Sequence, residues 1–434
     1  MGPGKGVVGG APPPLGLTPR EAALRILLEV RPQPPLRIPL HEALDAVLAE
    51  EVVSPLDIPP WTNSAMDGYA VRGQDVRAAS QTAPARLRVV EELPAGRFPT
   101  RPIGPGECAR IFTGAPLPEG ADTVIRQEDT DYGGQTVAIF KGQDAGANLR
   151  RAGEDIRRGT TVLLPGTELG PAQLGVLASL AVSHPVIYRR PRVAILGSGD
   201  EVADVDQADE ILSGRKIASS NTHSLIALVR RAGGEPVNLG IAKDSPESLR
   251  DHLARALDCD LLVTTAGISV GQHDFVRQVL TELGAELRFW RLRMRPGAPV
   301  GFGLLGAIPW IGLPGNPVST MVTFELFVRP AIRAMSGRAL PFRRTVPVRV
   351  AEAIRLVPRL QHFLRVVVTE PAGETDRPLA EARLTGPQGS GILTSMLTAN
   401  ALLIIPEGQF ETPAGATARA LVLDDPVHQR EPGF

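Results

Sequence analysis

One stretch, Asp260 to Asp274, limits what this chain can fold into more than any other. Its sequence, DLLVTTAGISVGQHD, begins as a short apolar strand, breaks into a turn with two glycines, and ends on an acid before an amphipathic run. In an open parallel sheet this order builds an anion site, because glycines let backbone N–H groups approach a ligand and the helix N-terminus adds positive potential. The alternative is an ordinary strand–helix connection, and the surrounding turns decide between them.

Strands and helices alternate around this stretch, from about residue 191 to 340. We expect strands at 192–196, 236–242, 261–265, 286–295 and 310–313, separated by helices, the first of which Asn221 would cap. This alternation predicts an open, mainly parallel α/β sheet covered on both faces. Ligands bind at the carboxyl ends of such strands. The acids and glycines expected at those ends are Asp200, Glu201, Asp244, Gly267, Asp274 and Gly315.

The side chains at this edge suit a phosphorylated ligand with a metal. Oxygen ligands from Asp200, Glu201, Asp244 and Asp274 could hold Mg²⁺ that bridges to phosphates. The strand at 286–295 is expected to carry three arginines, at 291, 293 and 295, on one face, because alternate strand residues point the same way. Their guanidinium groups suit phosphate or another oxyanion, and salt bridges at the surface are the alternative.

Composition and motifs exclude several other classes of protein. Lys plus Arg is 46 and Asp plus Glu is 47, so bulk charge does not favour a nucleic acid partner. Cys108 and Cys259 stand alone, which argues against a zinc site or a disulfide framework. Neither a dinucleotide fingerprint nor a Walker lysine motif is found. The N-terminus lacks the apolar segment of a signal peptide, and the apolar region 299–314 is too short to span a membrane, so we expect a cytoplasmic protein.

The flanking regions predict further domains, since 434 residues exceed what one core can serve. A capping box at Thr18 with Pro19 predicts a helix to about Val30, and an apolar face at 40–51 predicts a second helix. Short β runs predict an inserted small β domain and a C-terminal β barrel or sandwich. The expected division is a tail at 1–16, a helical and extended domain at 17–60 and 149–190, the inserted β domain at 61–148, the α/β domain at 191–340, the barrel at 341–426 and a tail at 427–434.

A series of motifs runs along the chain from about residue 17 to 425. They are SAMDGYA at 64–70, TGAP at 113–116, GED at 153–155, GDE at 199–201, GISVG with its following acid at 267–274, GLPGNPVS at 312–319 and QGS at 388–390. In this order they resemble the motifs of the molybdopterin molybdenumtransferases, a family that includes bacterial MoeA enzymes and the E domain of gephyrin. Several of the motifs are long, so the resemblance is specific.

The resemblance implies a four-domain homodimer with its active site between the sheet domain of one subunit and parts of the other. The implied reaction takes adenylylated molybdopterin and molybdate with Mg²⁺, cleaves the phosphoanhydride, releases AMP and leaves molybdenum on the dithiolene. A molybdopterin adenylyltransferase and recipient molybdoenzymes are the implied partners. Matching motifs carry over the catalytic residues Asp67, Thr113, Asp155, Glu201, Asp244 and Asp274. They carry over the substrate-binding residues Ser198, Gly267, Ser269, Arg291, Arg295, Pro314, Gly315, Pro317, Arg365 and Ser390.

Some residues depart from the family pattern. Arg291, Arg295 and Ala298 stand where many relatives have lysine, Ala266 stands where Gly-Gly is usual, and Ser219 replaces a common aspartate. Arginine can bind phosphate or molybdate but cannot supply a deprotonatable amine. Three alternatives stay open: adenylyl transfer from ATP to molybdopterin, a gephyrin-like scaffold without catalysis, and a paralogue that handles tungstate.

Overall fold

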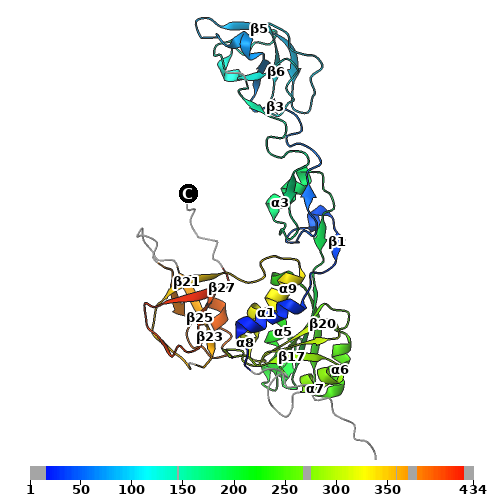
Figure 1. Cartoon of the computed structure of the whole chain (residues 1–434), viewed down its shortest axis with the longest axis vertical. Helices are drawn as coiled ribbons and strands as arrows, with labels where there is room; N and C mark the ends of the chain where they lie inside the picture. The colour runs from blue at the N-terminus through cyan, green and yellow to red at the C-terminus, as the bar shows by residue number, and fades with distance from the viewer. Residues whose placement is uncertain (1–15, 144–145, 267–274, 358, 370–378, 425–434) are drawn as a thin grey trace, which may run out of the picture. The chain divides into compact units, whose positions relative to one another are not determined.

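The computed structural model describes residues 16–143, 146–266, 275–357, 359–369 and 379–424 (Figure 1). The chain divides into two compact units. Unit 1 contains residues 1–36, 45–47 and 187–434, and unit 2 contains residues 37–44 and 48–186. No described helix is both long and apolar enough to cross a membrane. The finer division into six segments stays a prediction.

A mixed sheet forms the centre of unit 1. Its strands, in spatial order, are β15 (Glu235–Ala242), β12 (Arg192–Ser198), β16 (Leu261–Thr265), β20 (Ile308–Leu313), β19 (Gly301–Leu305) and β17 (Glu286–Trp290). The first four run parallel, and β19 runs antiparallel to both of its neighbours. The prediction of an open, mainly parallel α/β sheet is confirmed, although the sequence did not indicate the reversed strand β19.

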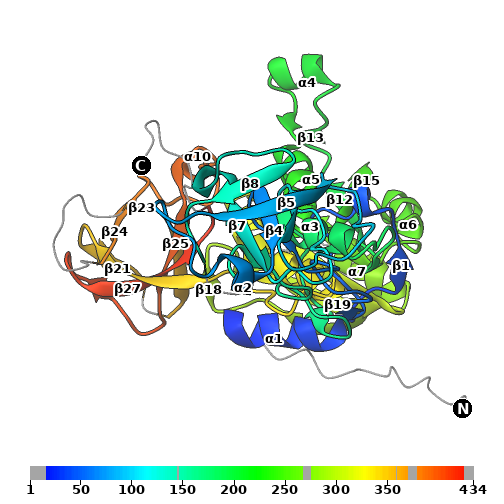
Figure 2. The same cartoon turned by 90° about the horizontal axis from the view of Figure 1, so that it is seen from above.

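Helices cover both faces of this sheet. Alternate residues of a strand point to opposite faces, so Val193 and Ile195 of β12 join one buried cluster, and Ala194 and Leu196 join another. The helices of the first face are α1 (Pro19–Glu29), α5 (Ser220–Ala232), α8 (Pro317–Thr323), the π-helix η3 (Phe324–Val328) and α9 (Arg329–Met335). The helices of the second face are α6 (Pro246–Ala254) and α7 (Phe275–Glu282). A short extension, seen in Figure 2, contains β13 (Val202–Ala203), α4 (Ala208–Leu212) and β14 (Ile217–Ala218).

A closed β barrel completes unit 1. Its strands are β21 (Thr345–Val350), β23 (Gln361–Thr369), β24 (Glu381–Leu384), β25 (Ala401–Ile405) and β27 (Thr417–Val422). The ring closes because β23 pairs with both β24 and β25. The short elements around it are β18 (Met294–Arg295), β22 (Ile354–Arg355), α10 (Ser395–Thr398) and β26 (Glu411–Thr412). The expected C-terminal β barrel is therefore confirmed.

A second, smaller sheet forms the core of unit 2. Its spatial order is β7 (Thr123–Arg126), β4 (Gly68–Val71), β6 (Glu107–Ile111), β5 (Ala85–Leu93) and β8 (Thr136–Ile139). Buried side chains of alternating strand residues, such as Tyr69 and Ala70, belong to separate clusters on the two faces. The remaining elements of the chain are β1 (Pro35–Arg37), η1 (Leu40–Glu42), β2 (Val52–Val53), β3 (Asn63–Ser64), α2 (Gly73–Val76), η2 (Gln127–Asp129), β9 (Leu149–Arg150), β10 (Thr161–Leu163), α3 (Pro171–Ser179) and β11 (Val186–Tyr188). The inserted small β domain is confirmed.

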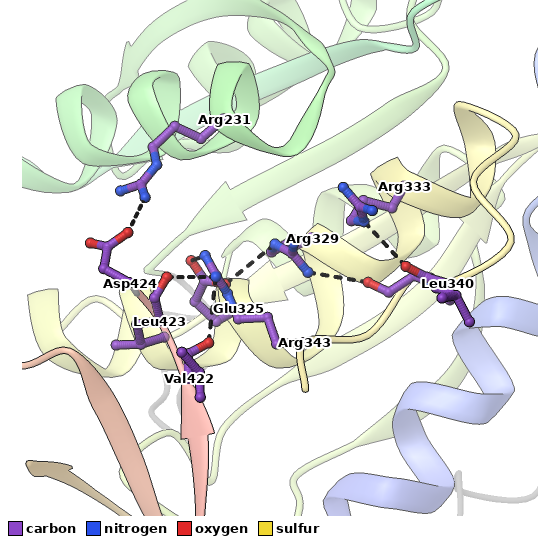
Figure 3. A network of polar contacts seen from close by, with 10 residues as sticks. Arg231, Glu325, Arg329, Arg333, Leu340, Arg343, Val422, Leu423 and Asp424 are labelled. Carbon is purple, nitrogen blue, oxygen red and sulfur yellow. Dashed lines mark hydrogen bonds and ion pairs between the residues drawn. The ribbon is translucent and has the colours of Figure 1, made fainter. Parts of the chain in front are cut away.

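A buried charge cluster, which we call the clasp, ties the π-helix to the barrel within unit 1 (Figure 3). It consists of Glu325, Arg329 and Arg343. The Glu325 carboxylate accepts hydrogen bonds from Nε and Nη2 of Arg343 at 2.6 and 3.3 Å, and Nε of Arg329 lies 3.7 Å away. Nη1 of Arg343 donates to the Leu423 carbonyl at 2.6 Å, just past strand β27. The clasp thereby fixes the barrel to the helical face.

Two expectations about secondary structure are wrong. The predicted helix at 40–51 is only the short 3₁₀ helix η1, because Asp45 has a left-handed backbone with φ of 61°, which an α-helix cannot contain. The predicted strand at 286–295 ends at Trp290, because Arg291 has φ of 66°. The chain then resumes as β18, which pairs with β23 of the barrel.

Candidate active site

A cavity of about 450 Å³ lies at the carboxyl ends of β12, β16 and β20. The predicted site residues that line it are Ser198, Glu201, Pro314, Gly315 and Pro317. Ser219, Asn221 and Ala266 line it too. Parallel strands bring their carboxyl ends to one edge, so these residues, which are distant in sequence, lie around one cavity.

The turn between β20 and α8 forms one wall of this cavity. Thr320 Oγ1 donates to the Pro314 carbonyl at 2.6 Å, and Asn221 Nδ2 donates to the Gly315 carbonyl at 2.7 Å. Asn221 was expected to cap α5, but that helix begins at Ser220, and the Asn221 amide holds the turn instead. Ala266 lies next to this turn, where its N–H donates to the Leu313 carbonyl at 3.2 Å, and its φ of 66° is a left-handed conformation that normally favours glycine.

Two of the predicted metal ligands, Asp200 and Asp244, lie close to each other but are not among the residues that line the cavity. The Asp200 N–H lies 3.4 Å from Oδ2 of Asp244, and the Asp244 N–H lies 3.3 Å from Oδ1 of Asp200. Among the described residues, no group of three or more His, Cys, Asp or Glu side chains could hold a metal ion. Asp274 lies outside the described residues, as do Gly267 and Ser269. The oxygen donors suit Mg²⁺, which needs only one or two carboxylates when phosphates complete its shell.

A second hollow of about 280 Å³ adjoins the cavity and shares Pro299, Pro314 and Asn316 with it. We call it the oxyanion groove. Arg295 and Ser390 line it, together with the loop at 296–299. Arg295 is exposed, and no ion pair between described residues involves it.

Arg365 is a fully buried cation in the barrel. Its Nε donates to Ser395 Oγ at 3.0 Å and its Nη2 donates to the Gly389 carbonyl at 3.0 Å, whereas its Nη1 has no partner within the described structure. Burial lowers the pKa of Arg365, because no carboxylate balances its charge. A third hollow of about 480 Å³ is lined by Arg365 and Arg295 and shares Gln388 with the oxyanion groove. Arg365 therefore lines this hollow with one guanidinium nitrogen, Nη1, that no described group satisfies.

The three arginines of the predicted basic strand do not act together. Arg293 forms an ion pair with Glu407 at 2.8 Å, with its Nε as donor, so its charge is already balanced. Arg291 lines none of the three hollows described above. Arg295 alone faces the oxyanion groove. The expectation of one basic face fails because the strand breaks at Arg291.

Asp67 and Thr113 form a hydrogen-bonded pair in unit 2. Oδ1 of Asp67 accepts from both the backbone N–H and the hydroxyl of Thr113, each at 2.8 Å. These bonds lower the pKa of Asp67, the backbone bond having the larger effect. Asp155 also lies in unit 2, where its N–H donates to the Ile58 carbonyl, and no hydrogen bond between described residues joins its side chain to this pair.

Comparison with known proteins places these features in a family. The "MoeA N-terminal region (domain I and II)" matches residues 17–181, the "Probable molybdopterin binding domain" matches 194–334, and the "MoeA C-terminal region (domain IV)" matches 347–423. The molybdopterin molybdenumtransferase of Nostoc sp. is 36% identical over 395 residues, which cover 90% of this chain and 88% of that protein. The chain belongs to the molybdopterin molybdenumtransferase family.

Other members of the family are similar to this chain over most of its length. Molybdopterin molybdenumtransferase 2 of Mycobacterium tuberculosis is 36% identical and covers 88% of this chain and 93% of its own length. The crystal structure of the molybdopterin biosynthesis moeA protein from Pyrococcus horikoshii aligns with a TM-score of 0.79 and 29% identity, over 94% of this chain and all of that one. As a molybdopterin molybdenumtransferase, the chain is a transferase with a role in molybdenum cofactor biosynthesis.

Sequence reasoning missed several residues at the site. Asn221 and Asn316 bond to groups 94 and 74 residues away, and no local pattern indicates such partners. The left-handed backbone at Ala266 was also missed, although the position of Ala266 next to the glycine of a turn could have indicated it. The roles carried over from the family motifs stay predictions.

Proposed function

We propose that this enzyme inserts molybdenum from molybdate into adenylylated molybdopterin with Mg²⁺ and releases AMP. The observation that supports this best is Arg365, a buried cation with an unpaired Nη1 and no acid beside it in the described structure. A buried charge without a counter-ion is costly, so an anionic ligand is the natural partner. Molybdate supplies that charge in a compact tetrahedral form.

The two adjoining hollows would bind different parts of the reaction's substrates. The cavity at the sheet edge has the size of a small-molecule site and offers the hydroxyl of Ser198 and the turn at Gly315. In our proposal it receives the pterin and its phosphates, while Arg295, Arg365 and Ser390 receive the oxyanion. Since the hollows adjoin, the oxyanion and the dithiolene would meet without leaving the enzyme.

Asp200 and Asp244 are the residues that would hold Mg²⁺ in this proposal, with Glu201 and Asp274 as further candidates. When bound, the ion would neutralise charge on the phosphoanhydride. The carboxylates would orient the substrate indirectly, because their positions determine where Mg²⁺ can bind its phosphates. The backbone N–H of each residue donates to the carboxylate of the other, which links the two turns.

We also propose that the enzyme acts as a homodimer. The family motifs in unit 2 contain polar residues of the kind a site needs, namely Asp67, Thr113 and Asp155. The resemblance assigns them to a site shared between subunits. The adenylyltransferase that makes the substrate and the molybdoenzymes that receive the product are the proposed partners.

An assay of AMP release tests the reaction. Purified protein would be given adenylylated molybdopterin, Mg²⁺ and molybdate, and AMP would be quantified by chromatography. We expect Arg365→Met and Glu201→Gln each to lower the rate at least about a hundredfold. The first removes a positive charge that would bind the oxyanion, and the second removes a negative charge that would help to hold Mg²⁺. Arg349→Met, an exposed arginine on β21, is the matched control and should keep the normal rate.

The same assay separates the alternatives. ATP consumption without a need for molybdate would replace our proposal with adenylyl transfer. Equal or faster turnover with tungstate would change the assigned oxyanion. Failure to bind adenylylated molybdopterin at all would favour a scaffold without catalysis, and full activity of both Arg365→Met and Glu201→Gln would refute the site.

A further inference from the structure

Asn316 occupies the N-cap position of α8 but does not cap the helix. An asparagine there normally accepts a hydrogen bond from one of the first helical N–H groups, and none is made by its side chain. Pro317 has no N–H to satisfy, and the Val318 N–H donates to the backbone carbonyl of Ser390 at 3.1 Å. A barrel loop therefore caps the helix, which leaves the Asn316 amide available for another contact.

That contact is with the hydroxyl of Ser390. Nδ2 of Asn316 donates to Ser390 Oγ at 3.1 Å. A serine hydroxyl has one hydrogen and two lone pairs, so the amide engages a lone pair and leaves the hydrogen to be donated elsewhere. Within the described part of the chain this hydroxyl makes no hydrogen bond as a donor, and Ser390 lines the oxyanion groove beside Arg295.

The backbone around Asn316 is held in place by hydrogen bonds to three consecutive carbonyl groups. The Asn221 amide binds the carbonyl of Gly315, the residue just before Asn316, and Thr320 Oγ1 binds the Pro314 carbonyl. The Thr320 N–H also donates to the Asn316 carbonyl at 2.9 Å. Because these bonds fix the backbone, the Asn316 side chain starts from a fixed position. Its hydrogen bond then sets the orientation of the Ser390 hydroxyl in the barrel loop.

We propose that Asn316 is a positioning residue that holds Ser390 as a hydrogen-bond donor to a tetrahedral oxyanion in this groove. The inference rests on the proposed function only in taking molybdate or tungstate as the oxyanion. A hydroxyl whose lone pair is engaged by an amide, next to a guanidinium, favours an anion over a cation. Asn316 itself need not touch the ligand.

A double-mutant cycle tests the proposal by binding rather than by turnover. Calorimetry would measure the dissociation constants of molybdate and tungstate for the whole chain without pterin. We expect Asn316→Ala to weaken binding about three- to tenfold, because the hydroxyl loses its orientation. In a Ser390→Ala background the same change should have almost no further effect, because no hydroxyl remains to be oriented.

A second variant gives a directional check. Asn316→Asp keeps the shape but replaces the donor by an acceptor that competes for the Ser390 hydrogen and adds negative charge, so binding should weaken at least about tenfold. Asn238→Asp on β15 introduces the same charge change away from the groove and should bind normally. Circular dichroism confirms that each variant is folded.

Three results would overturn the inference. One is normal binding by both Asn316 variants. Another is an equal loss from Asn316→Ala with and without Ser390, which would mean that the residue only supports the turn. The last is wild-type protein that binds neither oxyanion. Coupled binding without AMP release would instead refute the proposed function and leave this inference standing.

Discussion

At the scale of single residues, the Asp67–Thr113 pair shows how one carboxylate organises a turn. Two hydrogen bonds from Thr113 lower the pKa of Asp67. Because the folded pKa is depressed, these bonds stabilise the fold fully above the unfolded pKa, and the stabilisation is lost as the pH falls through the folded value. Across the neutral range the pair therefore stays intact.

Removal of this carboxylate should expose the Thr113 amide. In Asp67→Ala we expect the amide at Thr113 to exchange with solvent at least about tenfold faster at pH 7, because its acceptor is gone. Hydrogen-exchange mass spectrometry of the segment at 110–116 measures this. Asp75→Ala, which frees the Gly106 N–H in the same unit, should leave Thr113 protected. Unchanged exchange at Thr113 would show that the loop does not depend on Asp67.

At the scale of elements, the clasp explains how the barrel is fixed to the helical face of unit 1. Burial and the neighbouring guanidinium of Arg343 lower the pKa of Arg329 to about 10, so Arg329 is still a cation at neutral pH. Glu325 therefore balances two arginines while it is itself buried. Glu325 lies in the π-helix η3, and Figure 3 shows its contacts with Arg343 and Arg329.

Breaking the clasp should cost more than breaking a surface ion pair. We expect Arg343→Met to lower the free energy of unfolding by about 3–5 kcal/mol, because Glu325 stays buried without its closest partner. Urea unfolding followed by circular dichroism measures the loss. Arg349→Met should change the unfolding free energy by less than about 0.5 kcal/mol. A value for Arg343→Met as small as the control would mean that the clasp contributes no net stability.

At the scale of the whole molecule, each compact unit contains one buried cysteine. Cys108 lies in unit 2 and Cys259 in unit 1, with exposed fractions of 0% and 6%. Burial raises the pKa of the Cys108 thiol to about 12 and raises that of Cys259 as well. Since the thiolate is the nucleophile, both should resist alkylation until their own unit opens.

Thiol trapping can therefore report on each unit separately. At pH 8 we expect iodoacetamide to modify neither cysteine in the native protein, and urea to expose each at the midpoint of its own unit. Leu93→Ala opens a cavity in unit 2 and should destabilise it by about 2–5 kcal/mol. Mass spectrometry should show a lower urea midpoint for Cys108 only. An equal shift for Cys259 would show that the two units unfold as one.

Much of the fold could be predicted because its signals are local. The capping box at Thr18 lies where the sequence indicated it. Ser245, which caps α6 before Pro246, and the left-handed Gly233 after α5 are local signals of the same kind. Alternating strands and helices gave the sheet, and the sheet brought Ser198, Glu201 and the turn at Gly315 to one edge.

The sequence by itself determined the alternation of strands and helices in the central sheet and the ends of helices such as α1, because caps, glycines and apolar spacing act between neighbours in the chain. Only the tertiary structure decided that the basic strand breaks at Arg291, which leaves Arg295 facing the oxyanion groove. It also decided where the amides of Asn221 and Asn316 donate. These outcomes depend on groups that are distant in sequence, and their positions exist only once the sheet and the barrel have packed together.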